Sequence, residues 1–283
     1  MSKQLNSGYS IPEIGLGVYL TAPNQAFDIV YQALKLGYRH IDSAEAYGNE
    51  KEVCQGIRKW LDEDPANNLR KDVFYTTKIR NYHHGYEKAK KCISTRVQIA
   101  EEFIDYIDLI LIHDPMSNQK LRLETWNALQ ESVASGKVKS IGVSNYNVNH
   151  IKEIYNSPDF EIPPAVNQIE LNPWLMRTEI VDYCKSKQIV VEAYSPLTRG
   201  LRVNDPELIQ LAKKYNVSTA QILLRWSLDQ GFVILPKTIK VSRAQENLSV
   251  LDFKMTKEDS DSLSHPHDYY VSIPAWDPCK FET

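Results

Sequence analysis

The segment IDLILIH, residues 107–113, is apolar at nearly every position instead of alternating between apolar and polar. Such a run is typical of a parallel strand buried on both faces, because helices cover the sheet from outside. Seven further short runs have the same character. They are YRHID (38–42), VFYTTKI (73–79), VKSIGVS (138–144), AVNQIEL (165–171), IVVEAYS (189–195), FVILPK (232–237) and LSVLDF (248–253).

Segments with apolar residues at helical spacing separate most of these runs. They span residues 24–37, 121–137, 206–216 and 218–231. Pro206 and Ser218 stand where a helix would begin, and Gly37 and Gly231 stand where one would end. Strands that alternate with helices predict a (β/α)8 TIM barrel, with a doubly wound open sheet as the alternative.

The stretch KQLNSGYSIPEIGLGVYL (3–20) predicts an N-terminal β-hairpin that closes one end of the barrel, with NSG (6–8) as its turn. The chain shows no linker rich in proline, glycine or serine, no low-complexity tract and no exact repeat. These features predict a single domain over residues 1–283.

The composition favours a cytoplasmic protein and gives no indication of a nucleic-acid or membrane partner. The net charge of −3 gives no general attraction to nucleic acid or to an anionic membrane. The four cysteines are scattered without a C-x-x-C pair, which favours reduced thiols over disulfides or zinc. The first ten residues contain no apolar signal region, and no apolar run is long enough to span a bilayer.

Polar side chains stand where several predicted strands end, which is where barrel enzymes place their chemistry. Asp42, Lys78 and His113 each lie at or near the end of a run, and Tyr47 follows Asp42 by five residues. Each has a structural explanation when taken alone. An aspartate can cap a turn, a tyrosine can pack in a loop, a lysine can snorkel and a histidine can be a satisfied core residue.

Together these four side chains predict proton delivery to an oxygen atom. An ammonium near a phenol favours the phenolate, which predicts a lowered pKa for Tyr47. An aspartate paired with Lys78 would hold it in place, and a histidine would orient a carbonyl oxygen by hydrogen bonding. Acyl transfer is disfavoured, because no serine or cysteine nucleophile with a histidine partner is evident.

Seven ordered motifs resemble the motif set of the aldo-keto reductase superfamily, and most closely its short, fungal-type NADPH-dependent members. They are GYRHIDSAEAYGNE (37–50), TTKI (76–79), IDLILIH (107–113), IGVSNY (141–146), VNQIELNP (166–173), AYSPL (193–197) and LPKTIKVSRAQEN (235–247). The resemblance extends from residue 11 to residue 253 and implies a (β/α)8 barrel.

The resemblance also implies a catalytic tetrad of Asp42, Tyr47, Lys78 and His113. Tyr47 would be the general acid in carbonyl reduction and the general base in alcohol oxidation. Lys78, held by Asp42, would lower the pKa of the phenol. His113 would position the substrate oxygen, and with Tyr47 it would stabilise the developing alkoxide.

Hydride must come from a cofactor, since no side chain supplies one. GLGVY (15–19) lacks the third glycine and the strand–turn–helix context of a dinucleotide-binding fingerprint. The resemblance instead implies NADPH extended across the barrel mouth, with its carboxamide held by Ser144, Asn145 and Gln168 and its nicotinamide ring stacked on Tyr194. The other implied contacts on this side are Gly17, Val18, Tyr19, Ser195, Leu197 and Pro236.

Two of these motifs concern the phosphates. Ser195 and Leu197 would contact the pyrophosphate, although AYSPL could also be an ordinary strand-to-loop turn. Lys237, Thr238 and Arg243 match the clamp for a 2′-phosphate, which predicts NADPH over NADH. Glu246 and Asn247 would contact the adenine. The alternative for this second segment is an exposed basic loop that leads into a capped helix.

Three departures from the family pattern predict a polar substrate pocket. Asp114 and Arg80 stand where aromatic residues are usual, and Tyr19 replaces a frequent tryptophan. Arg80 and Asp114 would either pair with each other or recognise polar carbonyl compounds such as keto-lactones, α-dicarbonyls or keto-sugars. The short loop after His113 and the short tail predict an open site. Trp276 would fold over the pocket or anchor the tail.

The function predicted from these observations is NADPH-dependent reduction of a small-molecule carbonyl compound. The alternatives are a non-catalytic NADP(H)-binding regulatory subunit and, less favoured, a barrel hydrolase or isomerase. The histidine pairs at 83–84 and 265–267 lack partners at metal spacing, so no metal is predicted. Family members are often monomers, and a monomer is expected on that ground alone. Asn49 and Glu52 resemble a capping box that starts the next helix.

Overall fold

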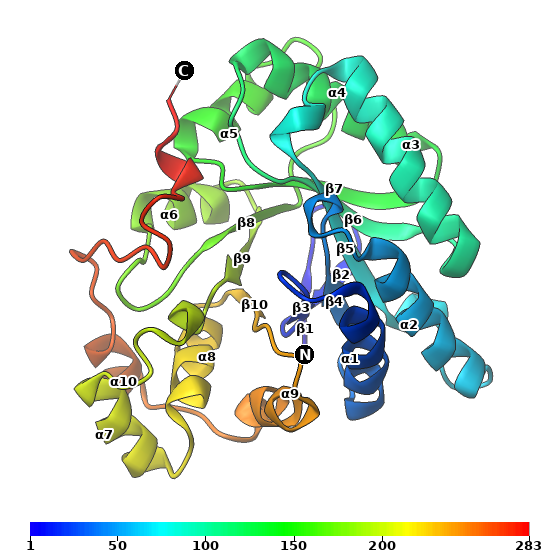
Figure 1. The fold of residues 1–283 in the computed structure, drawn as a ribbon. Helices are drawn as coiled ribbons and strands as arrows, with labels where there is room; N and C mark the ends of the chain where they lie inside the picture. The colour runs from blue at the N-terminus through cyan, green and yellow to red at the C-terminus, as the bar shows by residue number, and fades with distance from the viewer. Residues whose placement is uncertain (283) are drawn as a thin grey trace.

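Eight parallel strands form a nearly closed barrel in the computed structural model, which describes residues 1–282. The strands follow one another in chain order around the barrel, and Figure 1 looks down on them with the helices arranged outside. They are β3 (Leu16–Gly17), β4 (His40–Asp42), β5 (Phe74–Ile79), β6 (Ile107–Ile112), β7 (Val138–Ser144), β8 (Val166–Glu170), β9 (Val190–Tyr194) and β10 (Val233–Leu235). Bridges from Ile14 to Ile234 and from Gly17 to Lys237 join the two edge strands.

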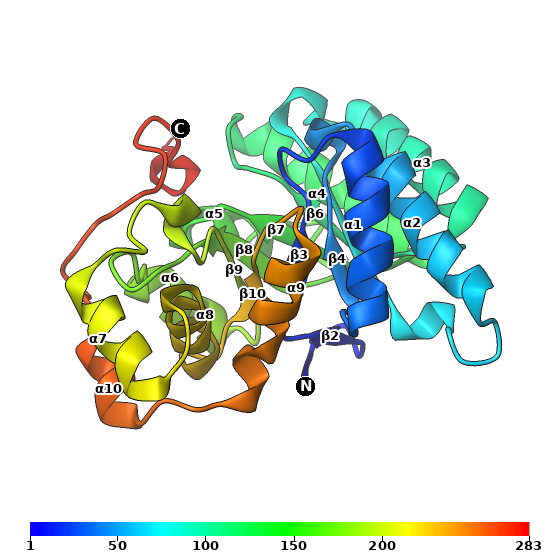
Figure 2. The ribbon, with the colours of Figure 1, turned by 60° about the horizontal axis from the view of Figure 1, so that its bottom comes forward.

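Helices connect the strands and cover the outside of the barrel (Figure 2). The α-helices are α1 (Pro23–Leu36), α2 (Glu50–Glu63), α3 (Tyr86–Phe103), α4 (Gln119–Ala134), α5 (Val148–Tyr155), α6 (Thr178–Ser186), α7 (Pro206–Tyr215), α8 (Thr219–Asp229), α9 (Val241–Leu248) and α10 (Lys257–Ser262). Short 3-10 turns are η1 (Glu45–Tyr47), η2 (Arg70–Asp72), η3 (Asn81–His83), η4 (Thr198–Gly200), η5 (Ser249–Asp252) and η6 (Pro278–Lys280). No helix within residues 1–282 combines the length and the apolar character needed to cross a bilayer.

The predicted barrel is confirmed, but one predicted strand is wrong. The run LSVLDF forms η5 directly after α9, with Val250 fully buried in the core. A short apolar run fits a buried helical turn as well as a strand, and no turn residue separates this run from the preceding helix. The eighth barrel strand is instead β3, whose two residues pair with Ile41 and Asp42 and are too few to show a periodicity.

The predicted helix signals are present in the structure. Gly37 ends α1 in the left-handed conformation at φ 109°, where a residue without Cβ avoids strain. Pro206 occupies the first turn of α7, and Ser218 forms a capping box with Gln221 at the start of α8. These local interactions fix where each helix begins or ends.

The predicted N-terminal hairpin is also confirmed, and it closes the amino end of the barrel. β1 (Ser2–Gln4) pairs antiparallel with β2 (Ser10–Pro12) around a turn that contains Gly8 at φ 88°. Leu5 and Ile11 are buried, and they belong to one apolar cluster with side chains of β5, β6, β8 and β10. The hairpin therefore seals the end of the barrel opposite the carboxyl ends of its strands.

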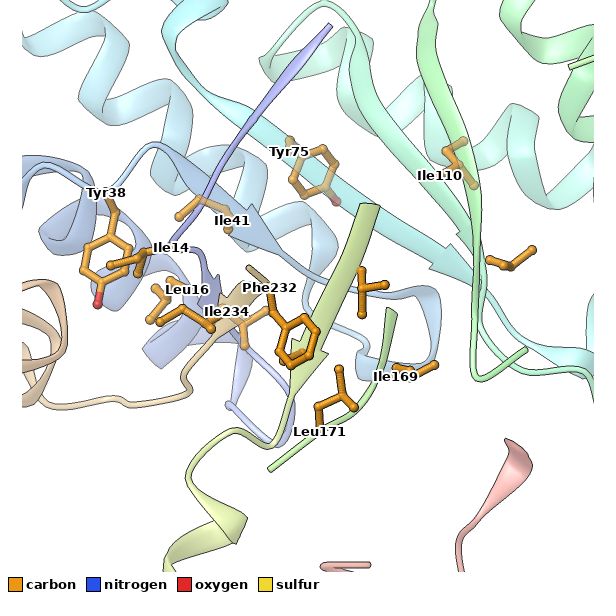
Figure 3. Close-up of a cluster of buried hydrophobic side chains, with 14 of the residues drawn as sticks. Ile14, Leu16, Tyr38, Ile41, Tyr75, Ile110, Ile169, Leu171, Phe232 and Ile234 are labelled. Atoms are coloured by element: carbon orange, nitrogen blue, oxygen red, sulfur yellow. The ribbon is translucent and has the colours of Figure 1, made fainter. Parts of the chain in front are cut away.

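Side chains alternate between the two faces of each strand, and the two faces differ in chemistry. Outward residues such as Ile41, Tyr75, Ile110 and Ile169 lie in the main apolar core, part of which Figure 3 shows. On β6 the alternate positions are the apolar Leu109 and Leu111. On β4, β5, β8 and β9 several alternate positions carry buried polar side chains, which are His40, Asp42, Thr76, Lys78, Gln168 and Glu192. These six side chains form a polar layer inside the barrel.

Candidate active site

The strand β4 and the turn that follows it place an acid and a phenol side by side. Asp42 is the last residue of β4 and is buried. The chain then turns through η1, which ends at Tyr47, and Gly48 follows in the left-handed conformation at φ 65°. This short turn brings the partly buried Tyr47 back over the carboxyl end of the barrel.

Lys78 connects these two groups from the neighbouring strand β5. Its Nζ donates to Asp42 Oδ1 at 2.5 Å, to the Ser43 carbonyl at 2.8 Å and to Tyr47 Oη at 3.4 Å. The side chain is fully buried, so these three oxygens provide the environment of the ammonium group. Asp42 and Thr76 are partners in the β4–β5 register, so Lys78 lies two residues beyond the level of Asp42, toward the carboxyl end where Tyr47 lies.

The net pKa of Tyr47 differs from the prediction. Burial raises the pKa of Tyr47 to about 12, and the Lys78 charge opposes this rise without overcoming it. Burial also lowers the pKa of Lys78, but the charges of Asp42 and Tyr47 outweigh it and the net pKa of the ammonium is raised. Tyr47 is therefore a neutral phenol and Lys78 a cation at neutral pH. The predicted lowering was wrong because desolvation of a phenolate exceeds one ammonium contact.

His113 lies on the other side of the phenol. Its ring centroid is 5.7 Å from that of Tyr47 in an edge-to-face arrangement, and the Tyr19 ring lies 5.1 Å from Tyr47. Burial, together with the Lys78 and Arg80 charges, lowers the pKa of His113 to about 3. The imidazole is thus neutral, and it is able to donate one hydrogen bond at the mouth.

The residues predicted to hold the carboxamide meet in one hydrogen-bond network. Ser144 Oγ donates to the Gln168 carbonyl at 2.7 Å, and Asn145 Nδ2 donates to the His113 carbonyl at 2.9 Å. Tyr194 Oη donates to Asn145 Oδ1 at 2.9 Å. Asn145 itself has a positive φ of 62°, a conformation that asparagine tolerates better than most residues. The network links the ends of β6, β7, β8 and β9.

Gln168 has its amide nitrogen fully engaged inside the barrel. Its Nε2 donates to Asp42 Oδ2 at 2.9 Å and to Glu192 Oε2 at 2.6 Å. Two carboxyl acceptors fix the orientation of the amide. Its Oε1 has no hydrogen-bond partner within residues 1–282, and it is not sealed from solvent. An acceptor is therefore available at the mouth for an amide N–H.

The remaining predicted cofactor residues lie on segments around this network. Gly17 and Val18 belong to the β3 exit, where their N–H groups donate to the Pro236 and Asp42 carbonyls. Ser195 follows β9 with a positive φ of 48°, and Leu197 packs against the core. Backbone strain of this kind is frequently found at ligand sites.

The predicted phosphate clamp lies after β10, on the loop 237–240 and on α9. Lys237 and Arg243 are exposed, and neither makes an ion pair in the part of the chain that the structure describes. Thr238 is buried and accepts from the Lys240 N–H at 3.0 Å. Glu246 is partly buried and Asn247 is buried on α9. Two cations without acidic partners make this segment fit for an anion.

Of the two alternatives for Arg80 and Asp114, the ion pair between them is absent. Arg80 Nε lies 3.0 Å from Glu45 Oε2, and His83 Nε2 lies 3.4 Å from the other oxygen of Glu45. Asp114 is buried and accepts from the Met116 N–H at 3.0 Å. The register brings β5 and β6 together, but the turn after β6 directs Asp114 toward its own backbone.

Two further predicted features have different outcomes. The prediction of a capping box at the start of α2 is wrong, because the Asn49 side chain does not cap the helix. Its amide donates instead to the Val18 and Thr21 carbonyls. Its Oδ1 accepts from Ser43 Oγ at 2.8 Å, so Asn49 ties the loop that carries Tyr47 to the β3 exit. Trp276 is 37% exposed, and its use in the pocket stays a prediction.

Sequence reasoning missed the polar groups beneath the tetrad. His40 and Glu192 are fully buried, with His40 Nε2 3.6 Å from Glu192 Oε1 and 3.2 Å from Thr76 Oγ1. A signal was available, because each interrupts an otherwise apolar strand with a titratable side chain. That signal does not predict which side chains His40 and Glu192 contact.

Comparison with known proteins places this arrangement in a family. The Aldo/keto reductase family model matches residues 13–265. A Saccharomyces cerevisiae protein named as an uncharacterized oxidoreductase is 48% identical over 94% of each chain. Glyoxal reductase of Bacillus subtilis is 40% identical over 92% of this chain and 90% of its own.

A solved structure agrees with these relatives. The crystal structure of MGS-M4, an aldo-keto reductase enzyme from a Medee basin deep-sea metagenome library, superimposes with a TM-score of 0.84. It is 38% identical and covers 93% of both chains. With a family model over most of its length, similar relatives and the same barrel, this chain belongs to the aldo-keto reductase family of oxidoreductases.

Proposed function

We propose that this chain reduces small carbonyl compounds with NADPH, and that Tyr47 donates the proton. The observation that carries the proposal is the buried Lys78 ammonium, which contacts both Asp42 and Tyr47 at the carboxyl end of the barrel. A structural lysine would place its charge in water, whereas this one is desolvated beside a phenol.

The protonation states suit reduction. Tyr47 is protonated at neutral pH because burial raises its pKa to about 12. When it donates its proton, the phenolate forms 3.4 Å from the Lys78 ammonium, which stabilises the new charge. Asp42 and the Ser43 carbonyl hold that ammonium in place. Neutral His113 would donate a hydrogen bond to the same substrate oxygen.

A nicotinamide cofactor supplies hydride when it is bound. The residues present fit this group, because Gln168 Oε1 is free to accept from a carboxamide N–H while its Nε2 is held by two carboxyls. Ser144 and Asn145 would complete the carboxamide site, and the half-buried Tyr194 ring would lie against the nicotinamide. Ser195 and Leu197 would contact the pyrophosphate.

In this proposal the protein prefers NADPH to NADH because it binds the 2′-phosphate that only NADPH carries. Lys237 and Arg243 have no acidic partners within residues 1–282, so a 2′-phosphate would gain two cations without breaking an ion pair. Glu246 and Asn247 lie on the same helix, where they would contact the adenine.

The substrates we propose are small polar carbonyl compounds, with α-dicarbonyls first. Arg80 and Glu45 form an ion pair near the phenol of Tyr47. The positive charge of Arg80 contributes to the lowered pKa of His113. A polar wall of this kind suits a substrate with a second oxygen. The relative named glyoxal reductase agrees with this choice.

The test is to follow NADPH consumption by absorbance with a panel of dicarbonyls, aldehydes and keto-lactones. For Tyr47→Phe, kcat should fall about 10²- to 10⁴-fold, because the general acid is lost, while NADPH affinity stays within about twofold. Tyr82→Phe is the matched control, since Tyr82 is exposed on the next loop. Full activity of Tyr47→Phe would refute the assigned acid. Tight NADPH binding without turnover would point to a regulatory subunit.

A further inference from the structure

Beneath the tetrad, two carboxyl groups share a single amide donor. Gln168 Nε2 donates to Asp42 Oδ2 at 2.9 Å and to Glu192 Oε2 at 2.6 Å. Both carboxyls are almost completely buried. Glu192 comes from β9, where it is the register partner of Gln168, whereas Asp42 ends β4 and pairs with Lys78. The tetrad and the carboxamide site are therefore joined through this one amide to Glu192.

The charges around Glu192 do not balance if both carboxyls are ionised. From β4 it faces His40 and Asp42, from β5 it faces Lys78 and the neutral Thr76, and the phenol of Tyr47 adjoins Lys78. On β8 it meets the neutral amide of Gln168, and its register partner on β10 is the apolar Val233. Lys78 is the one cation among these groups, and it already contacts Asp42 at 2.5 Å.

A proton on Glu192 removes this imbalance. Burial raises the pKa of Asp42, but Asp42 accepts from both Lys78 and Gln168, and these two contacts favour its ionised form. Glu192 accepts from Gln168 alone, and its Oε1 faces His40 Nε2 at 3.6 Å without another partner in the described residues. A protonated Glu192 would present its hydroxyl to that imidazole nitrogen while its carbonyl oxygen accepts from Gln168.

We propose that Glu192 is a positioning residue for carbonyl reduction and that it acts in its protonated form, holding Gln168 and leaving Lys78 to Asp42 and Tyr47. This inference rests on the function proposed above. Ionised Glu192 would place a second buried negative charge beside Asp42, draw on the same ammonium and weaken its support of the phenolate. Reduction would then fail at a pH where Tyr47 still carries its proton.

The direction of the pKa values agrees with this geometry. Burial and the Asp42 charge together raise the pKa of Glu192 to about 8, against the opposing effects of the Gln168 hydrogen bond and the Lys78 charge. Burial lowers the pKa of His40 to about 3, so the imidazole is available as a neutral acceptor. Because burial raises the pKa of Tyr47 to about 12, we expect the phenol to keep its proton where Glu192 loses its own.

The first test compares wild type, Glu192→Gln and Glu192→Leu between pH 6 and pH 10, with saturating NADPH and an aldehyde that does not titrate. Wild-type kcat should fall as pH rises through about 8. Glu192→Gln keeps an acceptor for Gln168 and a donor for His40, so it should match wild type within about threefold at pH 6 and show no such fall. Glu192→Leu should lose activity at every pH.

Two results would overturn the proposal. One is the same alkaline fall in Glu192→Gln as in wild type, and the other is wild-type activity of Glu192→Leu at pH 6. A merely structural role would lower stability without moving the pH profile of the folded enzyme. Circular dichroism at each pH would verify that the variants remain folded.

The second test does not depend on turnover. Between the ordinary pKa of glutamate and about 8, the folded protein holds a proton that the unfolded chain has released. This stabilisation is complete below the unfolded pKa and is lost as pH rises through the folded value. Unfolding midpoints should therefore fall with pH more steeply for wild type than for Glu192→Gln. If no carbonyl is reduced, this measurement still decides the protonation of Glu192, and parallel slopes would refute it.

Discussion

Lys78 shows how one side chain acquires its role from burial and partners together. The residue is fully enclosed, and its ammonium has three oxygen partners, among them an acid on a neighbouring strand and a phenol on the following turn. A lysine at this position in the sequence predicts only an end-of-strand cation. Its low-dielectric surroundings make the charge effective on Tyr47.

Arg243 allows the cofactor preference to be tested at one residue. In Arg243→Ala, the dissociation constant of NADPH should rise roughly ten- to hundredfold, because a charge-assisted contact to the 2′-phosphate is lost, while that of NADH stays nearly constant. Fluorescence titration with both cofactors measures this. Lys240→Ala is the control, since Lys240 is an exposed cation on the same loop. Equal weakening of NADPH and NADH by Arg243→Ala would mean that the phosphate is read elsewhere.

The N-terminal hairpin is the element that supports the barrel without taking part in its chemistry. Its buried residues fill the amino end, whereas the tetrad lies at the carboxyl ends of the strands. Apolar contacts at this end hold β5, β6 and β10 in the positions from which the inner polar layer projects. Stability and catalysis should therefore separate along the barrel axis.

Ile11→Ala tests this separation. The side chain is completely buried on β2, so its truncation should cost about 2–4 kcal/mol of unfolding free energy through the lost contacts and the cavity left behind. Denaturant titration measures this loss. At a temperature where the variant remains folded, kcat should be unchanged. Ser10→Ala, an exposed neighbour on the same strand, is the control. A matched loss of kcat in Ile11→Ala would contradict the separation.

At the scale of the whole molecule, the C-terminal segment packs against the outside of the barrel beside α5 and α6 (Figure 1). Arg177, buried before α6, donates to Asp277 at 2.8 Å, and Tyr269 Oη donates to the same carboxylate at 2.6 Å. The Ser272 N–H donates to Glu170 at the end of β8. The tail is therefore attached to the barrel mouth by charged hydrogen bonds.

Asp277→Ala should release this attachment. The Arg177 side chain is only 4% exposed, so loss of its partner should cost about 3 kcal/mol of unfolding free energy. Hydrogen exchange of residues 264–282 should speed up, while the barrel strands stay protected. Asp261→Ala is the control, because Asp261 pairs with Lys257 at the surface. If both variants exchange at the wild-type rate, the pair does not hold the tail.

Much of the fold and part of the site could be predicted because their signals are local. Continuous apolar runs, helix caps and turn glycines depend on residues a few positions apart, and they predicted the barrel, the hairpin and the helices α1, α4, α7 and α8. The two-residue strand β3 carried too little pattern, and the run 248–253 carried a pattern common to a strand and a helical turn. Both failures come from segments too short for a period to show.

The sequence by itself also placed Asp42, Lys78 and His113 at strand ends, since the end of an apolar run is visible in the chain. Side-chain partners required the tertiary structure. Asp42 meets Gln168 across 126 positions, and Arg80 meets Glu45 instead of Asp114. Barrel register and closure determine such contacts, and so does burial, which outweighs an ammonium in setting the pKa of Tyr47.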